Sequence, residues 1–420
     1  MHTVFLFDLD STITRQEILP TIAKKIGKER EMRELTEKTM MGDLPFADSF
    51  RMRVNILSQI PVSEVSKIVS EIEINPSIIK FIQENRENCY IVTNNLDVWI
   101  YDFLKRYNML DHCFCSHAEA QNDSLTGQIT INNKIDALNH FADQARVVAI
   151  GDGSNDYELI KKADIGISFG GVRTISPILH NVSDYSIYDD DKLYELLTAI
   201  AGRDNQDQPD RSVIISCAGM GTRLGAGKPK ALIDIEGEPL IAHTLKYLPD
   251  TCDIRIVIGY QAQKVIDTVT QIRKDVIFVY NHNYKNNGTG ASVSLAAHFG
   301  KKFILTIDGD VIMHPDDIKK ILTIEHEFVG VCPKSTDDPV LTITCDEKVT
   351  GFSRQTGDFE WTGVTMLDTS KIQYTDGHTY QIIEPLLPLK YELIREKEID
   401  TPNDYQSAIQ WIANNFKDQK

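Results

Sequence analysis

Two aspartates stand at the end of the first apolar run of the sequence. Asp8 and Asp10 follow Val4–Phe7 in the order Phe-Asp-Leu-Asp-Ser-Thr. Because side chains alternate along a strand, the two carboxylates point to the same side, and the carboxyl ends of parallel strands line the ligand crevice of an open sheet. Carboxylates held this close repel each other and need a cation or a shared proton. The pair alone also fits two turn-capping aspartates, so the rest of this half decides its meaning.

Further polar positions follow in a fixed order. They are Thr93 with Asn94 after Tyr90–Val92, Lys134, and the Gly-Asp-Gly-Ser-Asn-Asp of residues 151–156 after Val147–Ile150. The order Asp-x-Asp-x-Thr, Thr, Lys, Gly-Asp-Gly-x-Asn-Asp resembles the haloacid dehalogenase (HAD) superfamily of phosphatases, in its phosphoserine-phosphatase-like branch. The resemblance covers roughly residues 3–200.

The resemblance implies a role for each of these residues. Asp8 is the nucleophile that forms an aspartyl-phosphate, and Asp10 protonates the leaving alcohol and then activates water. Thr93 and Lys134 hold the phosphoryl oxygens, and Asn155 is a candidate substrate contact. Hard oxygen ligands suit Mg²⁺, and the ligands implied here are Asp8, Asp10 through its carbonyl, Asp152 and Asp156.

A helical pattern runs from about residue 14 to 75, and in this branch that insertion is a small cap over the site. Glu17 and Arg53 match positions that grip the amino-acid end of the substrate in phosphoserine phosphatases. The second motif departs from the family, because Thr93-Asn94-Asn95 stands where Ser-Gly-Gly is usual. Glycine at these positions allows the backbone to approach the substrate closely. Two amide side chains there narrow the pocket or change its polarity. We therefore expect a phosphatase, with Asn94 as a substrate contact, and question serine phosphate as its substrate.

A strand and a glycine-rich basic loop open the second half, within residues 213–232. A dinucleotide fingerprint fails because Leu224 stands at its third glycine position, and a P-loop fails because Pro229 follows Lys228. The loop resembles the nucleotidyltransferase signature Gly-x-Gly-Thr-Arg…Pro-Lys, in which glycine amides surround phosphate while Arg and Lys supply charge. The implied nucleotide contacts are Ala218, Gly219, Gly221, Thr222, Arg223 and Lys230, with Arg223 and Lys230 also catalytic.

Two acidic sets extend this resemblance. They are Asp308 with Asp310 after Phe303–Ile307, and Glu398 with Asp400 near the C-terminus. In this fold such sets hold Mg²⁺ on the nucleotide and acceptor phosphates. The implied reaction is attack of a phosphomonoester oxygen on the α-phosphorus with release of pyrophosphate, which depends on positioning and charge neutralisation.

The stretch of residues 286–293, Asn-Asn-Gly-Thr-Gly-Ala-Ser-Val, bears on the base. Asn-Asn…Ser-Leu occurs in phosphocholine-type cytidylyltransferases, Ala-Ser-Val in other cytidylyltransferases, and Gly-Thr in enzymes that read uracil. We favour CTP over another nucleoside triphosphate, with Gly288, Thr289 and Ser292 as contacts. Trp361 fits either a core position or a contact to a small cationic head group, since an indole face attracts ammonium.

Apolar runs and amphipathic stretches alternate along the whole chain. Besides those above, the runs include Ser212–Cys217, Ile254–Ile258 and Val276–Val279. Such alternation predicts an α/β fold with two doubly wound domains. By resemblance these are a Rossmann-like HAD domain with a small helical cap, residues 1–203, and a Rossmann-like nucleotidyltransferase domain with a mixed sheet, residues 212–420. Residues 204–211 carry Asp, Asn, Gln, Pro and Arg, which predicts a linker.

Composition limits the partners. The chain has 420 residues and a formal charge of 44 − 61 = −17, which disfavours nucleic acid and anionic membranes. The seven cysteines are scattered, which favours free thiols in a reducing compartment. No apolar run approaches the ~18 residues of a membrane span, and the N-terminus lacks the cationic region of a signal peptide. We expect a cytoplasmic protein without membrane insertion, whose partners are CTP and small phosphomonoesters, and leave a homodimer open.

The sequence is interpreted as a bifunctional enzyme. A Mg²⁺-dependent phosphatase is joined to a cytidylyltransferase that makes a CDP-activated small alcohol phosphate of the choline, ethanolamine, glycerol or amino-alcohol type, for surface polysaccharide or lipid decoration. If both sites used one phosphomonoester, one would destroy the other's substrate, so we expect different substrates or a phosphonate acceptor. The alternatives are a sugar-1-phosphate nucleotidyltransferase with an associated phosphatase, and a regulatory binding protein, which the intact motif residues disfavour.

Overall fold

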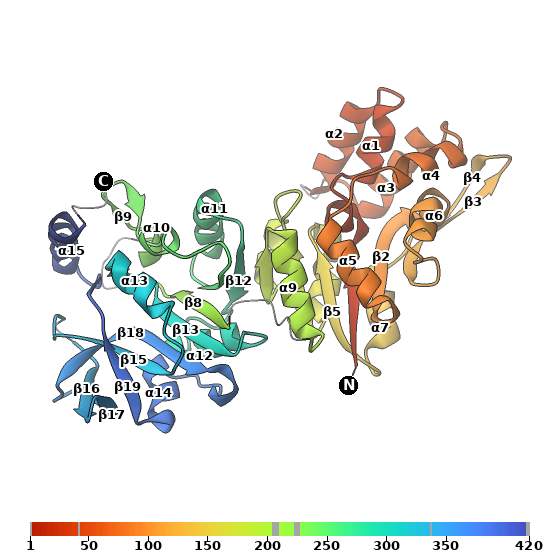
Figure 1. Cartoon of the computed structure of the whole chain (residues 1–420). Coiled ribbons are helices and arrows are strands. Elements are labelled where there is room, and N and C mark those ends of the chain that lie inside the picture. Colours follow the sequence, from red (N-terminus) through yellow and green to blue (C-terminus); the bar gives the residue numbers. More distant parts are fainter. Residues whose placement is uncertain (1, 41–42, 204–209, 222–226, 337, 417–420) are drawn as a thin grey trace. The chain divides into compact units, whose positions relative to one another are not determined.

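The computed structural model describes residues 2–40, 43–203, 210–221, 227–336 and 338–416. The chain divides into two compact units, Met1–Ala201 and Gly202–Lys420, each with strands and helices of its own (Figure 1). The linker expected at residues 204–211 lies mostly outside the described residues, and the first strand of the second unit begins at Arg211. Thr222 and Arg223, expected to bind the nucleotide, also lie outside the described residues.

A mainly parallel sheet forms the centre of the first unit. Its order is β7-β6-β5-β1-β2-β3-β4, parallel from β7 to β3 and antiparallel between β3 and β4. The strands are β1 (Thr3–Phe7), β2 (Cys89–Leu96), β3 (Cys113–Gln121), β4 (Ser124–Thr130), β5 (Arg146–Gly151), β6 (Ile165–Phe169) and β7 (Tyr185–Ile187). The chain runs from β1 to β2 on one side, and β5 pairs with β1 on the other, so the strand order reverses at β1. Ligand crevices of open α/β sheets form at such a point.

The continuous apolar run of β1 reflects burial on both faces. Val4 and Leu6 pack in the core formed with α7 and α8, whereas the ring of Phe5 meets that of Phe81 on α5, with centroids 4.9 Å apart. Strands covered on both faces lose the alternation of polar and apolar residues. Burial in this way fixes the end of β1, and therefore Asp8, within a rigid layer.

Helices cover the sheet and form a separate layer at its carboxyl edge. The covering helices are α5 (Pro76–Glu84), α6 (Asp97–Arg106), α7 (Lys134–Phe141), α8 (Tyr157–Lys162) and α9 (Asp190–Ile200). The layer near the end of β1 consists of α1 (Ile18–Lys24), α2 (Glu29–Met40), α3 (Phe46–Leu57) and α4 (Val62–Ser70) (Figure 1). A bridge between Thr14 and Ile74 joins the two chain segments that lead into and out of this layer.

The second unit contains a mixed sheet. Strands β12, β11, β8 and β13 are parallel neighbours in that order, and β18 continues the sheet antiparallel to β13. Beyond β18, the pairings β18-β16-β17-β19-β15-β18 close on themselves. These strands are β8 (Arg211–Cys217), β11 (Asp253–Ile258), β12 (Val276–Tyr280), β13 (Phe303–Asp308), β15 (Phe328–Cys332), β16 (Leu341–Cys345), β17 (Lys348–Ser353), β18 (Phe359–Asp368) and β19 (Leu389–Leu393).

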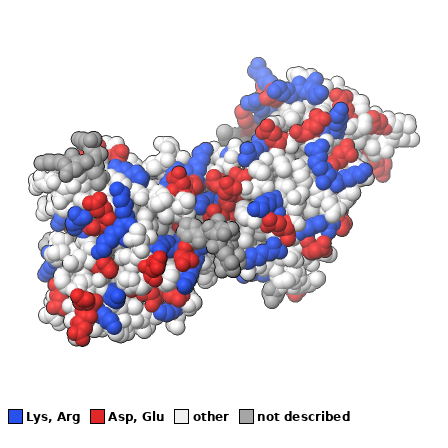
Figure 2. All heavy atoms as spheres, viewed as in Figure 1, with Lys and Arg blue, Asp and Glu red and all other residues white. Residues whose placement is uncertain are grey.

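In the part of this unit that the structure describes, two short ribbons and six α-helices accompany the sheet. The ribbons pair β9 (Asp234–Ile235) with β10 (Glu238–Pro239) and β14 (Val311–Met313) with β20 (Glu396–Glu398). The helices are α10 (Ala242–Leu245), α11 (Ala262–Ile272), α12 (Thr289–Ala297), α13 (Pro315–Ile321), α14 (Thr379–Ile383) and α15 (Pro402–Asn415). No helix in the described ranges is both long and apolar enough to cross a bilayer. On the face of each unit seen in Figure 2, basic and acidic side chains are interspersed.

Candidate active sites

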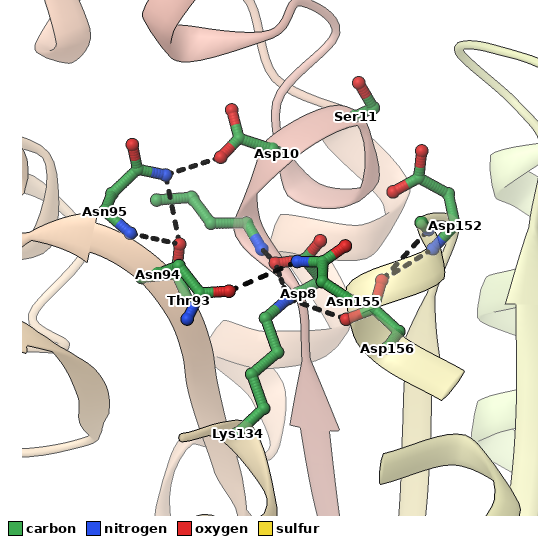
Figure 3. A network of polar contacts seen from close by, with 12 residues as sticks. Asp8, Asp10, Ser11, Thr93, Asn94, Asn95, Lys134, Asp152, Asn155 and Asp156 are labelled. Carbon is green, nitrogen blue, oxygen red and sulfur yellow. Dashed lines mark hydrogen bonds and ion pairs between the residues drawn. The ribbon is translucent and has the colours of Figure 1, made fainter. Parts of the chain in front are cut away.

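A buried lysine joins two aspartates at the carboxyl ends of neighbouring strands in the first unit. Asp8 follows β1, and its Oδ1 lies 2.6 Å from Lys134 Nζ, which also donates to Asp156 Oδ1 at 2.6 Å (Figure 3). Lys134 begins α7, and Asp156 ends the turn that follows β5. The backbone N–H of Asp8 donates to Ile150 O at 2.9 Å, which fixes the end of β1 against β5.

The electrostatics of this trio keep the lysine charged. Burial raises the pKa of Asp8, and the Asp156 carboxylate raises it further. Burial also disfavours the charged form of Lys134, but the Asp156 and Asp8 carboxylates outweigh this effect and raise the Lys134 pKa. Lys134 is therefore a fixed cation, available to an anionic group that enters beside Asp8.

Asp156 also organises the turn after β5. Its Oδ2 accepts hydrogen bonds from the N–H groups of Gly153 at 3.0 Å and Asp152 at 3.2 Å. A Cβ on Gly151 would lie 2.5 Å from the Asp156 carboxylate, so glycine is required there for the turn to close. With both oxygens engaged, Asp156 acts chiefly by orienting Lys134 and the turn.

The carboxylates of this site suit a divalent cation. Oxygens of Asp8, Asp152 and Asp156 lie within 4.8 Å of one another. Asp152 Oδ1 is buried and has no hydrogen-bond partner among the described residues, and burial raises the Asp152 pKa to about 7. A buried, unsatisfied carboxylate oxygen beside a second carboxylate is what a hard cation such as Mg²⁺ satisfies.

Asp10 lies outside this carboxylate group, closer to the helical layer. Its Oδ1 accepts from the N–H of Ile18 at the start of α1 at 2.7 Å, and its Oδ2 accepts from the side-chain amide of Asn95. The same amide and the N–H of Asn95 donate to Thr93 Oγ1 at 3.0 and 3.1 Å. Because both bonds use the oxygen of Thr93 as acceptor, its hydroxyl proton can be donated to a ligand.

The two other predicted amides lie at the rim of the same cavity. Asn155 Nδ2 donates to Asn94 Oδ1 at 3.3 Å, and Asn94 Nδ2 donates to the carbonyl of Asn132 at 2.7 Å (Figure 3). Both line the cavity, whose volume is about 110 Å³. Asn132, which also donates to the carbonyl of Thr93 at 3.0 Å, was not singled out from the sequence.

The cap end of the cavity holds Glu17, Arg53 and Arg173. Arg173 forms ion pairs with both Glu17 and Asp152. Sequence reasoning missed Arg173, although it follows Gly170-Gly171 just after β6, and a basic residue beyond a glycine pair at a strand's carboxyl end is a recognisable anion-site signal. Arg53 is 9% exposed, and its burial lowers its pKa against the attraction of Asp10 and Glu17.

In the second unit, three carboxylates surround a lysine. Oxygens of Asp310, Glu398 and Asp400 lie within 4.8 Å of one another. Lys230 Nζ donates to Asp310 Oδ2 at 2.6 Å and contacts Asp400. The β14–β20 ribbon makes this possible, because it pairs Val311 with Glu398 although they are far apart in the chain.

Asp308 stands beside this group at the end of β13. Burial raises its pKa to about 8, with a further contribution from Asp310, and burial likewise raises the pKa of Glu398 to about 8, followed by Asp310 and Asp400. Glu396, which the sequence reasoning missed, has a pKa raised by burial and then by Glu398. Its Oε2 is buried without a partner among the described residues. Burial and mutual repulsion thus favour the protonated form of these carboxyl groups. Such a cluster can exchange its protons for a divalent cation.

The side of this cavity that carries the expected nucleotide contacts is formed by the loop after β8 and the start of α12. Ala218 and Gly219 line it together with Gly288, Thr289 and Ser292, and a Cβ on Gly221, also in the loop, would lie 2.8 Å from the Lys230 side chain.

A network of amides borders this surface. Asn281, at the carboxyl end of β12, donates to Ser292 Oγ at 3.0 Å and exchanges amide hydrogen bonds of 3.0 and 3.2 Å with Asn287. Asn281 was missed, although a polar residue directly after the strand Val276–Tyr280 was the signal for it. The network presents donors and acceptors of fixed orientation, which suits a nucleobase edge.

Two aromatic side chains, Trp361 and Tyr380, also line this cavity. Trp361 lies on β18 and donates from Nε1 to Thr365 Oγ1 at 3.0 Å, and its ring lies 5.9 Å from that of Phe352. Phe352 is in turn 5.9 Å from Tyr380. The cavity volume is about 320 Å³, larger than that of the first unit, and Trp361 lines it.

Comparison with known protein families assigns each unit separately. The family described as haloacid dehalogenase-like hydrolase matches residues 5–161, and the MobA-like NTP transferase domain matches residues 213–368. A phosphoserine phosphatase of Methanocaldococcus jannaschii is 30% identical over 197 residues, which cover 44% of this chain and 91% of that protein. A phosphoserine phosphatase of Archaeoglobus fulgidus is 31% identical over 44% of this chain. The chain spans about half of that relative's length, 56%.

Two solved structures are each similar to about half of the chain. A CTP:phosphocholine cytidylyltransferase from Streptococcus pneumoniae is 20% identical and covers 48% of this chain and 99% of its own, with a TM-score of 0.40. HddC from Yersinia pseudotuberculosis, complexed with GMP-PN, is 23% identical with the same coverage and a TM-score of 0.40.

Proposed function

We propose that this chain, which belongs to the haloacid dehalogenase-like hydrolases through its first unit and to the MobA-like NTP transferases through its second, works as a bifunctional enzyme with separate active sites. Residues 1–203 would hydrolyse a small phosphomonoester, and residues 212–420, after the linker 204–211, would transfer a cytidylyl group from CTP to a small alcohol phosphate. The observation that carries the proposal is the pair of lysine–carboxylate clusters, one in each unit, each opening into its own cavity.

In the phosphatase site, Asp8 is the proposed nucleophile. The N–H of Leu9 and the ammonium of Lys134 hold its Oδ1 at 2.8 and 2.6 Å, which assigns the attack on phosphorus to Oδ2. The bond from phosphorus to the alcohol oxygen then breaks as Asp10 gives that oxygen its proton. Water next attacks the aspartyl-phosphate, Asp10 takes a proton from it, and Asp8 is regenerated. Thr93 donates to a phosphoryl oxygen throughout.

Mg²⁺ fits this site through Asp8, Asp152 and the carbonyl of Asp10. A bound divalent ion there would neutralise charge on the phosphoryl oxygens. Lys134, positioned by Asp156, adds a second charge that needs no reorganisation during the reaction. In the second unit, Asp308, Asp310, Glu398 and Asp400 are the proposed ligand set.

In the transferase site, the chain itself binds and aligns the reactants. The acceptor phosphate oxygen attacks the α-phosphorus of CTP, and the bond to the leaving pyrophosphate breaks. Ala218 and Gly219 line the phosphate side, and the Asn281–Asn287–Ser292 network is the proposed reader of the cytosine edge. Trp361 and its aromatic neighbours would contact the head group of the acceptor, where a cationic group is favoured by the indole face.

The acceptor and the phosphatase substrate are proposed to differ, because a shared phosphomonoester would be destroyed before it was activated. Choline, ethanolamine, glycerol and amino-alcohol phosphates are the acceptor class proposed, for decoration of surface polysaccharide or lipid. A phosphonate acceptor satisfies the same constraint, because its carbon–phosphorus bond resists this phosphatase chemistry.

The test is pyrophosphate release measured over the four nucleoside triphosphates and a panel of phosphomonoesters, phosphonates and hexose 1-phosphates, with Mg²⁺ present. Free phosphate is followed in parallel, with Asp8→Asn as the control for the first site. CTP-dependent release with a small alcohol phosphate or phosphonate supports the proposal. Release that requires UTP or GTP and a hexose phosphate overturns the cytidylyl assignment, and phosphate release unaffected by Asp8→Asn overturns the phosphatase assignment.

A further inference from the structure

The loop that carries Arg173 is tightly placed. It follows β6, and the N–H of Ser176 donates to Asp152 O at 2.9 Å, which ties the loop to the turn after β5. A Cβ on Gly171 would lie 2.2 Å from the Phe169 ring, and one on Gly153 would lie 3.1 Å from the Arg173 guanidinium. Side chains at these positions would displace the loop or the guanidinium, so the local sequence is compatible with an arginine held at this place.

Arg173 engages one of the two side chains that were expected to grip the amino-acid end of the substrate. The guanidinium forms ion pairs with Glu17, at the start of the helical layer, and with Asp152. A divalent cation at Asp152 would compete with Arg173 for Asp152 but not for Glu17. With Glu17 already paired to a cation of this chain, an ammonium group on the substrate would have to displace Arg173 to reach it.

Arg53 brings a second guanidinium to the cap end of the cavity. Arg53 is 9% exposed, and its guanidinium donates to two neutral acceptors, the Ser49 carbonyl and Thr36 Oγ1, both at 3.4 Å. Among the described residues, no carboxylate lies within ion-pair distance of Arg53. The Asp10 and Glu17 carboxylates attract this guanidinium, but only from beyond that distance. A buried cation with only long, neutral contacts is poorly compensated until an anion binds it.

We propose that Arg173 makes the phosphatase site selective for phosphomonoesters whose far end carries a second anionic group, a carboxylate or a phosphate, and no ammonium. Arg173 neutralises Glu17, and Arg53 and Arg173 together bind the distal anion while Asp8 attacks the phosphoryl group. This inference rests on the proposed phosphatase activity and specifies its substrate class.

The experiment uses the full chain with Mg²⁺ and a set of esters that differ in their distal charge. 3-Phosphoglycerate and O-phosphoserine form a matched pair, since a hydroxyl replaces the ammonium. O-Phosphoethanolamine carries the ammonium alone, ethylene glycol bisphosphate carries a second phosphate, and p-nitrophenyl phosphate carries no distal charge. The kcat and KM for phosphate release are measured for the wild type and for Arg173→Gln, Arg173→Lys and Glu17→Gln, with Arg30→Gln, whose side chain is 93% exposed, as the matched control.

The wild type is expected to favour 3-phosphoglycerate or the bisphosphate over O-phosphoethanolamine by about ten- to hundredfold in kcat/KM, mainly through KM. In Arg173→Gln, the kcat/KM for the anionic esters, divided by that for p-nitrophenyl phosphate, is expected to fall by about tenfold or more. Arg173→Lys is expected to restore part of this ratio. Glu17→Gln is expected to lower the KM for the anionic esters, because it releases Arg173. The magnesium concentration for half-maximal activity, measured for each variant, separates a loss of metal binding from a loss of distal contact.

The opposite pattern overturns the proposal. If the wild type prefers O-phosphoserine or O-phosphoethanolamine, and Glu17→Gln raises the KM for these two esters, Glu17 binds a substrate ammonium and Arg173 does not set the selectivity. Equal losses for all esters in Arg173→Gln, with Arg173→Lys no better, assign the residue a structural role instead. If p-nitrophenyl phosphate and every other ester resist hydrolysis, the phosphatase proposal itself fails.

Discussion

Asp308 and Glu398 are buried beside other carboxylates, and this fixes how their metal site should depend on pH. Burial raises the pKa of each to about 8, with Asp310 the next cause for both. Because metal ligands must be deprotonated, protons compete with Mg²⁺ below that pH. The magnesium concentration for half-maximal pyrophosphate release should therefore fall as pH rises from about 6.5 to about 8.5, by up to about tenfold per pH unit. A midpoint that stays constant over this range would contradict the assignment of these residues as ligands.

The same raised pKa values determine whether the metal-free protein becomes more or less stable as pH rises. Without metal, the folded state keeps protons on Asp308, Glu398 and Asp152 that the unfolded state, with ordinary carboxyl pKa values, has released above about pH 5. The free energy of unfolding of the metal-free protein should therefore decrease as pH rises from about 5 to about 8. Thermal melts with a chelator should show this fall, and melts with Mg²⁺ should not, since the ion replaces the protons.

Asp8 and Asp308 provide a test of independent catalysis at the level of single side chains. Asp8→Asn removes the proposed nucleophile but keeps its size, so phosphate release should drop by about a thousandfold or more. Pyrophosphate release should stay within about twofold of the wild type. Asp308→Asn should give the reverse result. Parallel colorimetric assays of the two products on the same preparations measure both, and a joint loss in either variant would show that the sites depend on each other.

At the level of elements, the segment before α14 packs against the start of α12 and positions the proposed nucleotide side of the second cavity. The N–H of Gly288 donates to Asp376 O at 2.7 Å, and that of Gly290 donates to Gly377 O at 2.9 Å. Thr379 donates from its N–H and hydroxyl to Thr289 Oγ1 at 3.1 and 3.0 Å. This backbone-to-backbone approach leaves no room for side chains, which is why glycines occupy it.

Gly288→Ala should therefore damage nucleotide binding more than folding. Its Cβ would lie 2.3 Å from Gly377 O, a clash that costs about 1–3 kcal/mol of unfolding free energy and displaces the start of α12. The KM for the nucleotide should rise about tenfold, because that contact energy is lost from binding. Gly351→Ala on β17 is the matched control, since its Cβ would meet only Ile343 Cδ1, at 3.7 Å. Equal effects of both variants on KM would show that the start of α12 does not take part in nucleotide binding.

The elements also explain what the sequence could and could not predict. Buried runs such as Val4–Phe7 and Phe303–Ile307 can be recognised as strands in the sequence because each strand is covered on both faces. In the structure, β1 and β13 lie at these runs. The ion pair of Arg173 with Glu17 joins residues 156 positions apart, and the β14–β20 ribbon that gathers the acidic group is a long-range pairing. Contacts of that range depend on the packing of whole elements, which local patterns do not encode.

At the level of the whole molecule, each unit holds its own lysine, its own carboxylates and its own cavity. An acidic chain of −17 thus meets its anionic substrates with placed cations instead of a broadly basic surface. Both proposed reactions use a small phosphate ester. The phosphatase therefore has to leave the acceptor of the transferase intact, or the protein would consume the substrate of its own second reaction.

This requirement can be measured in a single reaction. The full chain is incubated with CTP, Mg²⁺ and the acceptor that supports the fastest pyrophosphate release, and the yield of CDP-activated product is compared between the wild type and Asp8→Asn. We expect equal yields, because the Arg53 and Arg173 end of the first cavity disfavours an acceptor with a neutral or cationic head group. The acceptor alone, incubated with the Asp308→Asn variant, should release no phosphate. A higher yield with Asp8→Asn would mean that the first site hydrolyses the acceptor, and that the two activities oppose each other instead of serving separate substrates.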